Sequence, residues 1–139
     1  MARTPIFPRG RQAAYDQYGY SAAIKSGDLL FVSGQVGVHD DGGAINEPTA
    51  QIEQAFENLR LVLDAAGCSM GDVVDVTSFH VDMHRHFEVF RAVKQKIFPT
   101  APFPNWTAVG VTTLADPSLI FEIKVIAQIP SNCSGGASD

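Results

Sequence analysis

The segment spanning residues 48–66 restricts the possible folds more than any other feature of the sequence. Apolar residues recur in it at helical spacing and form one stripe, made of Ile52, Ala55, Phe56, Leu59, Val62, Leu63 and Ala66. Pro48 suits the first turn of this helix, and Gly67 suits its C-terminal stop. A helix with a single apolar stripe must pack that stripe on another apolar surface, so the rest of the chain has to supply one.

Strand-like segments on both sides of this helix are predicted to supply that surface. They occupy residues 20–24, 29–33, 73–81, 106–114 and 119–129. The first two are joined by the turn Lys25-Ser26-Gly27-Asp28 and form a hairpin, and the last two flank a turn that contains Ala115-Asp116-Pro117. Residues 86–98 are predicted to form a second helix, which Pro99 ends.

This order of elements predicts an α+β protein in which two helices cover one face of a sheet. Two helices cannot cover both faces of so wide a sheet, and the second face also carries apolar side chains. We therefore expect the chain to form an oligomer through that face. The 139 residues are predicted to form one domain over residues 4–130, followed by a small and polar tail, residues 131–139, that is disordered.

Composition and charge exclude several classes of function. The net charge is −5, and no basic stripe is present, so we expect no binding to nucleic acid or to anionic membranes. The longest apolar runs are far too short to span a membrane, and the first residues lack the apolar core of a secretory signal, so a cytoplasmic protein is expected. Cys68 and Cys133 do not make a disulfide framework, and both thiols are interpreted as incidental.

The sequence predicts no metal and no organic cofactor. His80 and His84 are four residues apart, a spacing that binds metal on a helix, but His80 ends a predicted strand while His84 and His86 lie in a loop and at a helix start. No cysteine or further carboxylate completes a ligand set. Glycine-rich nucleotide-binding motifs and the serine-hydrolase motif are also missing from the sequence.

Several segments, taken in order, resemble the Rid (reactive intermediate deaminase, YjgF-like) family over nearly the whole domain. They are Leu30-Phe31-Val32-Ser33-Gly34-Gln35-Val36, the helix from Gln54 to Gly67, Asp72-Val73-Val74-Asp75-Val76-Thr77, and the ends of a final hairpin at Phe103-Pro104 and Phe121-Glu122-Ile123. The YjgH-like branch of that family is the nearest likeness. It is indicated by Tyr20-Ser21-Ala22-Ala23-Ile24, by residues 26–37, and by Pro104-Asn105-Trp106-Thr107-Ala108-Val109-Gly110-Val111-Thr112.

The resemblance implies a chorismate-mutase-like fold with one mixed β-sheet and two helices on one face. It also implies a homotrimer whose sheets form a central barrel, with small-molecule pockets at the subunit interfaces. In deaminases of this kind a glutamate positions the attacking water, and no cofactor is needed. That glutamate falls on Glu122, and the residues that contact the substrate fall on Tyr20, Gly34 and Ala108. The arginine that binds the carboxylate of a 2-imino acid falls on Trp106.

The tryptophan changes the expected substrate, because an indole offers one donor and no charge, whereas a guanidinium holds a carboxylate through two hydrogen bonds. Losing such an anchor costs on the order of a hundredfold to a few thousandfold in binding. Trp106 either packs in the protein or stacks on a flat ligand. Arg91 is a replacement cation if its side chain reaches the site instead of extending to solvent.

Two functions remain open at this point. The first is a cofactor-free hydrolytic deaminase of an imine or enamine other than the usual 2-imino acids, with Glu122 as its catalytic residue and Tyr20, Trp106 and Arg91 around the ligand. The alternative is a metabolite-binding trimer without catalysis. By strand periodicity alone, Glu122 is a solvent-facing carboxylate paired with Lys124, and only the resemblance gives it a catalytic role. RNA cleavage, which is attached to the family by name, is disfavoured by the acidic charge.

Overall fold

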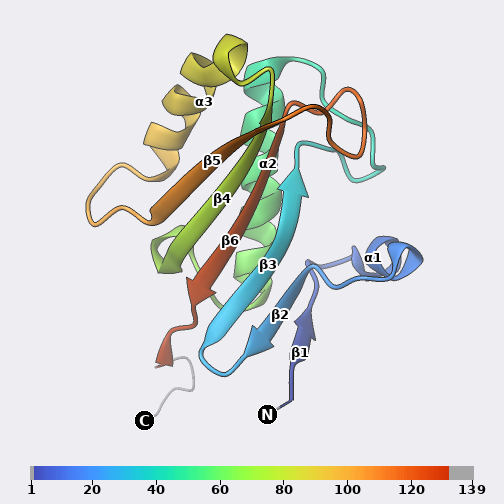
Figure 1. Ribbon diagram of the computed structural model, residues 1–139. Helices are drawn as coiled ribbons and strands as arrows, with labels where there is room; N and C mark the ends of the chain where they lie inside the picture. Colours follow the sequence, from blue (N-terminus) through green and yellow to red (C-terminus); the bar gives the residue numbers. More distant parts are fainter. Residues whose placement is uncertain (1, 132–139) are drawn as a thin grey trace.

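The computed structural model describes residues 2–131, which form one six-stranded sheet with two long helices on one face (Figure 1). In chain order the elements are β1 (Thr4–Ile6), α1 (Gln12–Tyr18), β2 (Ala23–Ser26), β3 (Leu29–Val36), α2 (Pro48–Ala65), a 3₁₀ turn (Met70–Asp72), β4 (Val73–Val81), α3 (Met83–Ile97), β5 (Asn105–Val111) and β6 (Phe121–Gln128). The strand order is β1-β2-β3-β6-β4-β5, and β4 and β5 are parallel while the other pairs are antiparallel. The mixed sheet with two helices on one face is confirmed. Residues 132–139, which include Cys133 and nearly all of the predicted tail, lie outside the described residues.

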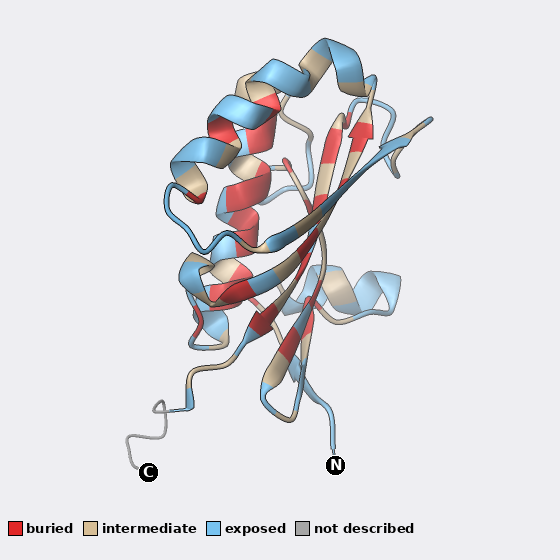
Figure 2. Ribbon diagram, turned by 60° about the vertical axis from the view of Figure 1, so that its left-hand side comes forward, coloured by how far each residue is buried: buried red, intermediate tan, exposed pale blue. Residues whose placement is uncertain are grey.

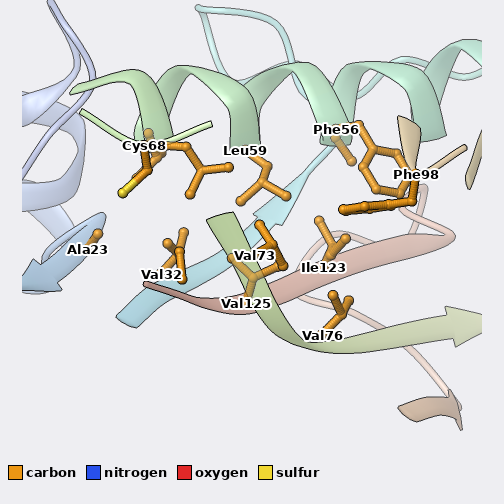
Figure 3. Packing of buried hydrophobic residues seen from close by; sticks show 14 of the residues in the cluster. Ala23, Val32, Phe56, Leu59, Cys68, Val73, Val76, Phe98, Ile123 and Val125 are labelled. Atoms are coloured by element: carbon orange, nitrogen blue, oxygen red, sulfur yellow. The ribbon is translucent and has the colours of Figure 1, made fainter. Parts of the chain in front are cut away.

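Helix α2 forms as its sequence predicts. Glu47 precedes the helix, and its carboxylate accepts hydrogen bonds from the backbone N–H groups of Thr49 and Ala50 at 3.1 and 2.8 Å. The helix ends at Ala65, and Gly67 follows in the left-handed region with φ of 77°. Its apolar stripe packs on buried residues of the sheet to form the core shown in Figure 3, which joins Phe56, Leu59, Val32, Val76, Ile123 and Val125.

The last two strands do not pair with each other, so the expected final hairpin is wrong. Helix α3 returns the chain to the same end of the sheet, and β5 therefore pairs in parallel with β4 at the sheet edge. Strand β6 then enters between β3 and β4 and pairs antiparallel with both. Helix α3 also begins earlier than predicted, so that His84 and His86 both lie on it.

The N-terminal part contains a strand and a helix that the sequence patterns did not predict. Residues 20–22, expected to be strand, are irregular, and β2 begins at Ala23. Before them stands the short helix α1, which ends at Gly19 with φ of 76° and buries none of its residues completely. Along β3, only the first half is paired with β2. Helix α1 contacts the second half, where Tyr15 is hydrogen-bonded to Gln35. Helix α1 thus lies beside the end of β3 (Figure 1).

The sheet face opposite α2 and α3 is left uncovered in the single chain (Figure 2). Phe31 on β3 is 39% exposed and Val109 on β5 is 37% exposed. Their cross-strand neighbours on this face, Ile126 and Phe79, are half-buried. One apolar face without a covering layer is what the sequence predicted, and the oligomer that would cover it stays a prediction.

Candidate functional site

Glu122 lies on the uncovered face of the sheet. It alternates on β6 with Phe121 and Ile123, which are buried against the helices, so its side chain points to the opposite side. The carboxylate is half-buried, and this burial raises its pKa above the ordinary value, although Lys124 two residues on partly opposes the change. A carboxyl group with a raised pKa exchanges protons more readily near neutral pH than an exposed one does, which suits it to general acid–base chemistry.

Gly34 makes room for this carboxylate. The pairing of β3 with β6 is irregular between Val32 and Gln35, and Gly34 lies within that bulge. A Cβ added to Gly34 would lie 1.9 Å from Oε2 of Glu122, which is far inside van der Waals contact. Only a glycine therefore allows the carboxylate to lie directly against the backbone of β3 at this point.

Tyr20 is the third member of the same group. Burial raises the pKa of its phenol, and the neighbouring Tyr15 and the Glu122 carboxylate add to the effect. The phenol therefore stays protonated at neutral pH and can donate a hydrogen bond. Its ring is 49% exposed and meets the ring of Tyr15 edge-on at 5.0 Å. The structure thus brings together Tyr20, Gly34 and Glu122, three of the residues that the resemblance selected.

A cavity of about 200 Å³ adjoins this group. It lies between α1, the second half of β3 and the turn that follows, and both Tyr20 and Gly34 contribute to its wall. The remaining lining residues are Gly10, Arg11, Ala14, Tyr15, Tyr18, Gln35, Val36, Val38, His39, Asp40, Gly42 and Asn58. A space of this size holds a small metabolite rather than a nucleotide.

Trp106 lies on the other face of the sheet. Its indole packs between Phe90 and Phe98 with ring centroids 5.8 and 5.6 Å away, and Nε1 donates a hydrogen bond to Oγ of Ser78 at 2.9 Å. The ammonium of Lys94 lies 4.3 Å from the ring centroid. Within one chain Trp106 therefore packs under α3, and it does not share a pocket with Glu122.

Ala108 and Arg91 are also separate from the Glu122 group. Ala108 is exposed on β5, the edge strand, and lies opposite Ser78 of β4. The side chain of Arg91 is 58% exposed, and Nε lies 3.7 Å from a carboxylate oxygen of Glu88 one turn earlier on α3. Arg91 therefore extends to solvent in the single chain, and does not reach the Glu122 carboxylate.

A buried polar array that was not predicted from the sequence lies next to Trp106. Ser78 and His80 are 0% and 3% exposed, and Oγ of Ser78 lies 2.8 Å from Nε2 of His80. Burial lowers the pKa of His80 from 6.5 to about 4, so the ring is neutral at neutral pH. Because Ser78 accepts from Trp106, its own O–H donates to His80. The alternation along β4 places both side chains under the helices, and that periodicity was the signal that could have found them.

Arg11 is a second residue that was missed, because α1 itself was not predicted. Its guanidinium lines the cavity, donates from Nη1 to Oδ1 of Asn58 at 3.2 Å, and forms an ion pair with Asp40. Among residues 2–131, no group of three or more His, Cys, Asp or Glu side chains is placed to hold a metal ion. Across the same residues, no helix has the length and apolar character that crossing a membrane requires.

Comparisons with known proteins agree with this architecture. The family model described as endoribonuclease L-PSP matches residues 11–129. The RutC family protein YjgH of Escherichia coli (strain K12) is 56% identical over 130 residues, which cover 94% of this chain and 98% of that protein. The 2-iminobutanoate/2-iminopropanoate deaminase of Salmonella typhimurium is 33% identical over 111 residues, covering 78% of this chain and 85% of the other.

Solved structures give the same result. A structural-genomics structure of protein YjgH matches with a TM-score of 0.88 and 54% identity over 94% of this chain and 99% of that one. RidA from the Antarctic bacterium Psychrobacter sp. PAMC 21119 matches with a TM-score of 0.74 and 33% identity over 80% and 89% of the two chains. On the family match and these relatives, the chain belongs to the endoribonuclease L-PSP family, the group that contains the YjgF and Rid proteins.

Proposed function

We propose that this chain is a hydrolytic deaminase that needs no cofactor and acts on a small imine or enamine other than the usual 2-imino acids. The observation that carries the proposal is the half-buried carboxylate of Glu122, which has a raised pKa and lies against Gly34 beside the protonated phenol of Tyr20. The relative that is named a 2-iminobutanoate/2-iminopropanoate deaminase supports the reaction class.

The chemistry follows from these groups. Glu122 takes a proton from a water molecule whose oxygen attacks the imine carbon, the π electrons of the C=N bond move to nitrogen, and Glu122 passes the proton on to this nitrogen. In the resulting carbinolamine, Glu122 takes the proton of the new hydroxyl group and delivers it to the amine nitrogen. The C–N bond breaks, a C=O bond forms, and ammonia leaves. The net reaction converts imine and water into a carbonyl compound and ammonia. Tyr20, whose phenol stays protonated, is proposed to donate a hydrogen bond to the substrate during both steps.

The pocket is proposed to lie between subunits of a homotrimer. The uncovered apolar face supports an oligomer, since Phe31 and Val109 are exposed on the same side of the sheet as Glu122. In this arrangement the edge of a neighbouring subunit, with Ala108 and Trp106 on β5, would close the side of the site that one chain leaves open. A small metabolite would be the ligand.

A kinetic comparison tests the proposal. 2-Iminobutanoate and 2-iminopropanoate are generated in situ by a pyridoxal-phosphate lyase, and their decay is followed with the wild type, Glu122→Gln and Glu53→Gln. Glu53 is an exposed carboxylate on α2 and serves as the matched control. Because these imines are not the proposed substrate, we expect only slow acceleration by the wild type and by Glu53→Gln, and none by Glu122→Gln. The rate should also fall in acid, with the midpoint above the ordinary glutamate pKa, because Glu122 must be ionised to take the proton. Equal rates for all three proteins would remove Glu122 from the mechanism.

The variant Trp106→Arg extends this experiment to the substrate. If the wild type is slow on these two imines and Trp106→Arg is faster, the catalytic carboxylate is intact and the substrate class has changed. The alternative function, a metabolite-binding trimer without catalysis, is favoured by one observation: the Trp106 indole is already engaged by Ser78 and offers no cation to a substrate. Thermal stabilisation by a ligand, without product in any of the variants, would support that alternative.

A further inference from the structure

The cavity lined by Tyr20 and Gly34, the residues that adjoin Glu122, contains a fixed cation. The side chain of Arg11 is only 21% exposed, and its Nη1 donates to Oδ1 of Asn58 at 3.2 Å. Asn58 is itself 1% exposed, and its amide nitrogen donates to the carbonyl oxygens of Val36 and Val38 at 2.8 and 3.1 Å. The guanidinium is thus held by an amide that the end of β3 and the turn after it orient. Such a donor is pre-organised, so a ligand does not have to order it.

The other side of the guanidinium is occupied by a carboxylate that is easily displaced. Asp40 forms an ion pair with Arg11, but the side chain of Asp40 is 90% exposed and belongs to a turn. An ion pair whose carboxylate is this exposed contributes little to stability, on the order of 0–1 kcal/mol, so exchanging that carboxylate for another costs little. Asp40 therefore marks the position that the carboxylate of a ligand would take.

The surroundings of this cation favour a small organic anion. Tyr15, Tyr18 and Tyr20 contribute aromatic side chains to the cavity wall. Among the residues that line the cavity in the described part of the chain, Arg11 is the one lysine or arginine. A guanidinium with aromatic walls in about 200 Å³ fits a carboxylate attached to a short carbon skeleton.

We propose that Arg11 binds a carboxylate of the substrate in place of Asp40, which makes Arg11 the specificity-determining residue of the pocket. This inference rests on the proposed function and refines its substrate class. Glu122 faces the uncovered side of the sheet, whereas Arg11 reaches Asn58 on α2, which covers the other side. The carboxylate and the reacting carbon must therefore be several bonds apart. The substrate is an imine or enamine with a distal carboxylate, and not one whose only carboxylate is attached to the imine carbon.

The kinetic test uses two isosteric substrates. An amino-acid oxidase converts glutamate into 2-iminoglutarate and glutamine into the corresponding imine with a neutral distal amide. With the wild type, we expect a lower KM for 2-iminoglutarate than for the imine with the neutral amide. Arg11→Gln should raise that KM on the order of ten- to a hundredfold, with kcat nearly unchanged, and should leave the amide substrate unaffected. Arg60→Gln is the matched control, since Arg60 is also paired to a carboxylate, that of Glu57, but does not line the cavity.

A binding measurement separates this inference from catalysis. We expect 2-oxoglutarate to raise the melting temperature of the wild type and of Arg60→Gln but not of Arg11→Gln, and 2-oxobutanoate, which lacks the distal carboxylate, to have less effect. That pattern without imine turnover would support carboxylate binding by Arg11 and refute the deaminase proposal. Imine turnover with the same KM for 2-iminoglutarate in the wild type and in Arg11→Gln would support the deaminase proposal and refute carboxylate binding by Arg11.

Two further variants keep the inference testable if Arg11→Gln does not fold. Arg11→Lys keeps the charge but loses the two-pronged donor, so it should bind 2-oxoglutarate more weakly than the wild type and more strongly than Arg11→Gln. Asp40→Asn removes the competing carboxylate and should bind 2-oxoglutarate more tightly than the wild type does. Equal or weaker binding by Asp40→Asn would overturn the exchange of carboxylates.

Discussion

Acidification should destabilise this protein through one buried histidine. His80 is 3% exposed, and burial lowers its pKa from 6.5 to about 4 in the folded chain. Between these two values the unfolded chain binds a proton that the folded chain does not, so the free energy of unfolding rises with pH. The contribution is complete above about pH 6.5 and is lost as the pH falls toward about 4. A span of about 2.5 pH units, at about 1.36 kcal/mol per unit, corresponds to about 3 kcal/mol.

The measurement is urea unfolding, followed by circular dichroism at one fixed protein concentration, at several pH values between about 7 and 4. The wild type is compared with His80→Gln, which cannot take up a proton. We expect the stability difference between the two proteins to change by about 3 kcal/mol over this range, in the direction that penalises the wild type in acid. Acidic residues whose pKa is lowered, such as Glu47 and Glu57, contribute equally to both proteins and cancel.

The control is His84→Gln, because His84 is exposed on α3. This variant should follow the wild type at every pH. If the curves of the wild type and of His80→Gln stay parallel, His80 titrates alike in the folded and unfolded chains. The account of a neutral ring that accepts a hydrogen bond from Ser78 would then be refuted.

Three further outcomes follow from the geometry. Gly34→Ala should abolish imine hydrolysis while changing the melting temperature little, because the added Cβ meets the mobile end of the Glu122 side chain; unchanged kinetics would contradict this. Phe31→Lys should leave the folded single chain intact, since this side chain is 39% exposed, but should reduce the sedimentation coefficient by breaking the proposed oligomer. Trp106→Phe should lower the free energy of unfolding by about 1–3 kcal/mol in urea, because Oγ of Ser78 loses its buried donor.

The regular elements could largely be predicted from the sequence, but the pairing of the strands could not. The stripe on α2 was predicted from its periodicity, because one face of the helix is buried, and the strand β4 was predicted from its content of Val, Thr and Phe. The partners of β5 and β6 were wrong, since strand propensity does not encode which strands pair and neighbours in sequence favour a hairpin. Helix α1 was missed because it buries no residue completely and leaves no apolar stripe, although Gly19 marked its end.

The candidate site, like the fold, could be predicted from the sequence only in part. Glu122 alternates with apolar neighbours, so its position on one face of β6 could be read directly, while its contact with Gly34 depends on a bulge that no pattern indicates. Trp106 was assigned by likeness to a ligand site, yet its register beside Val76 turns it toward the helices. Arg11 was not found because its role depends on Asn58 and Asp40, which are distant in sequence.

The position of β6 has a consequence for the order of synthesis. Among the strands of the described residues this one is the last to be made, yet it lies between β3 and β4 and pairs with both. Until it emerges from the ribosome, the nascent chain holds two separate strand groups, β1–β3 and β4–β5, each with an open edge and a half-covered apolar surface. Contacts between such distant segments form slowly, because long loops must close first. The incomplete chain is therefore the stage at which this protein is most prone to aggregate.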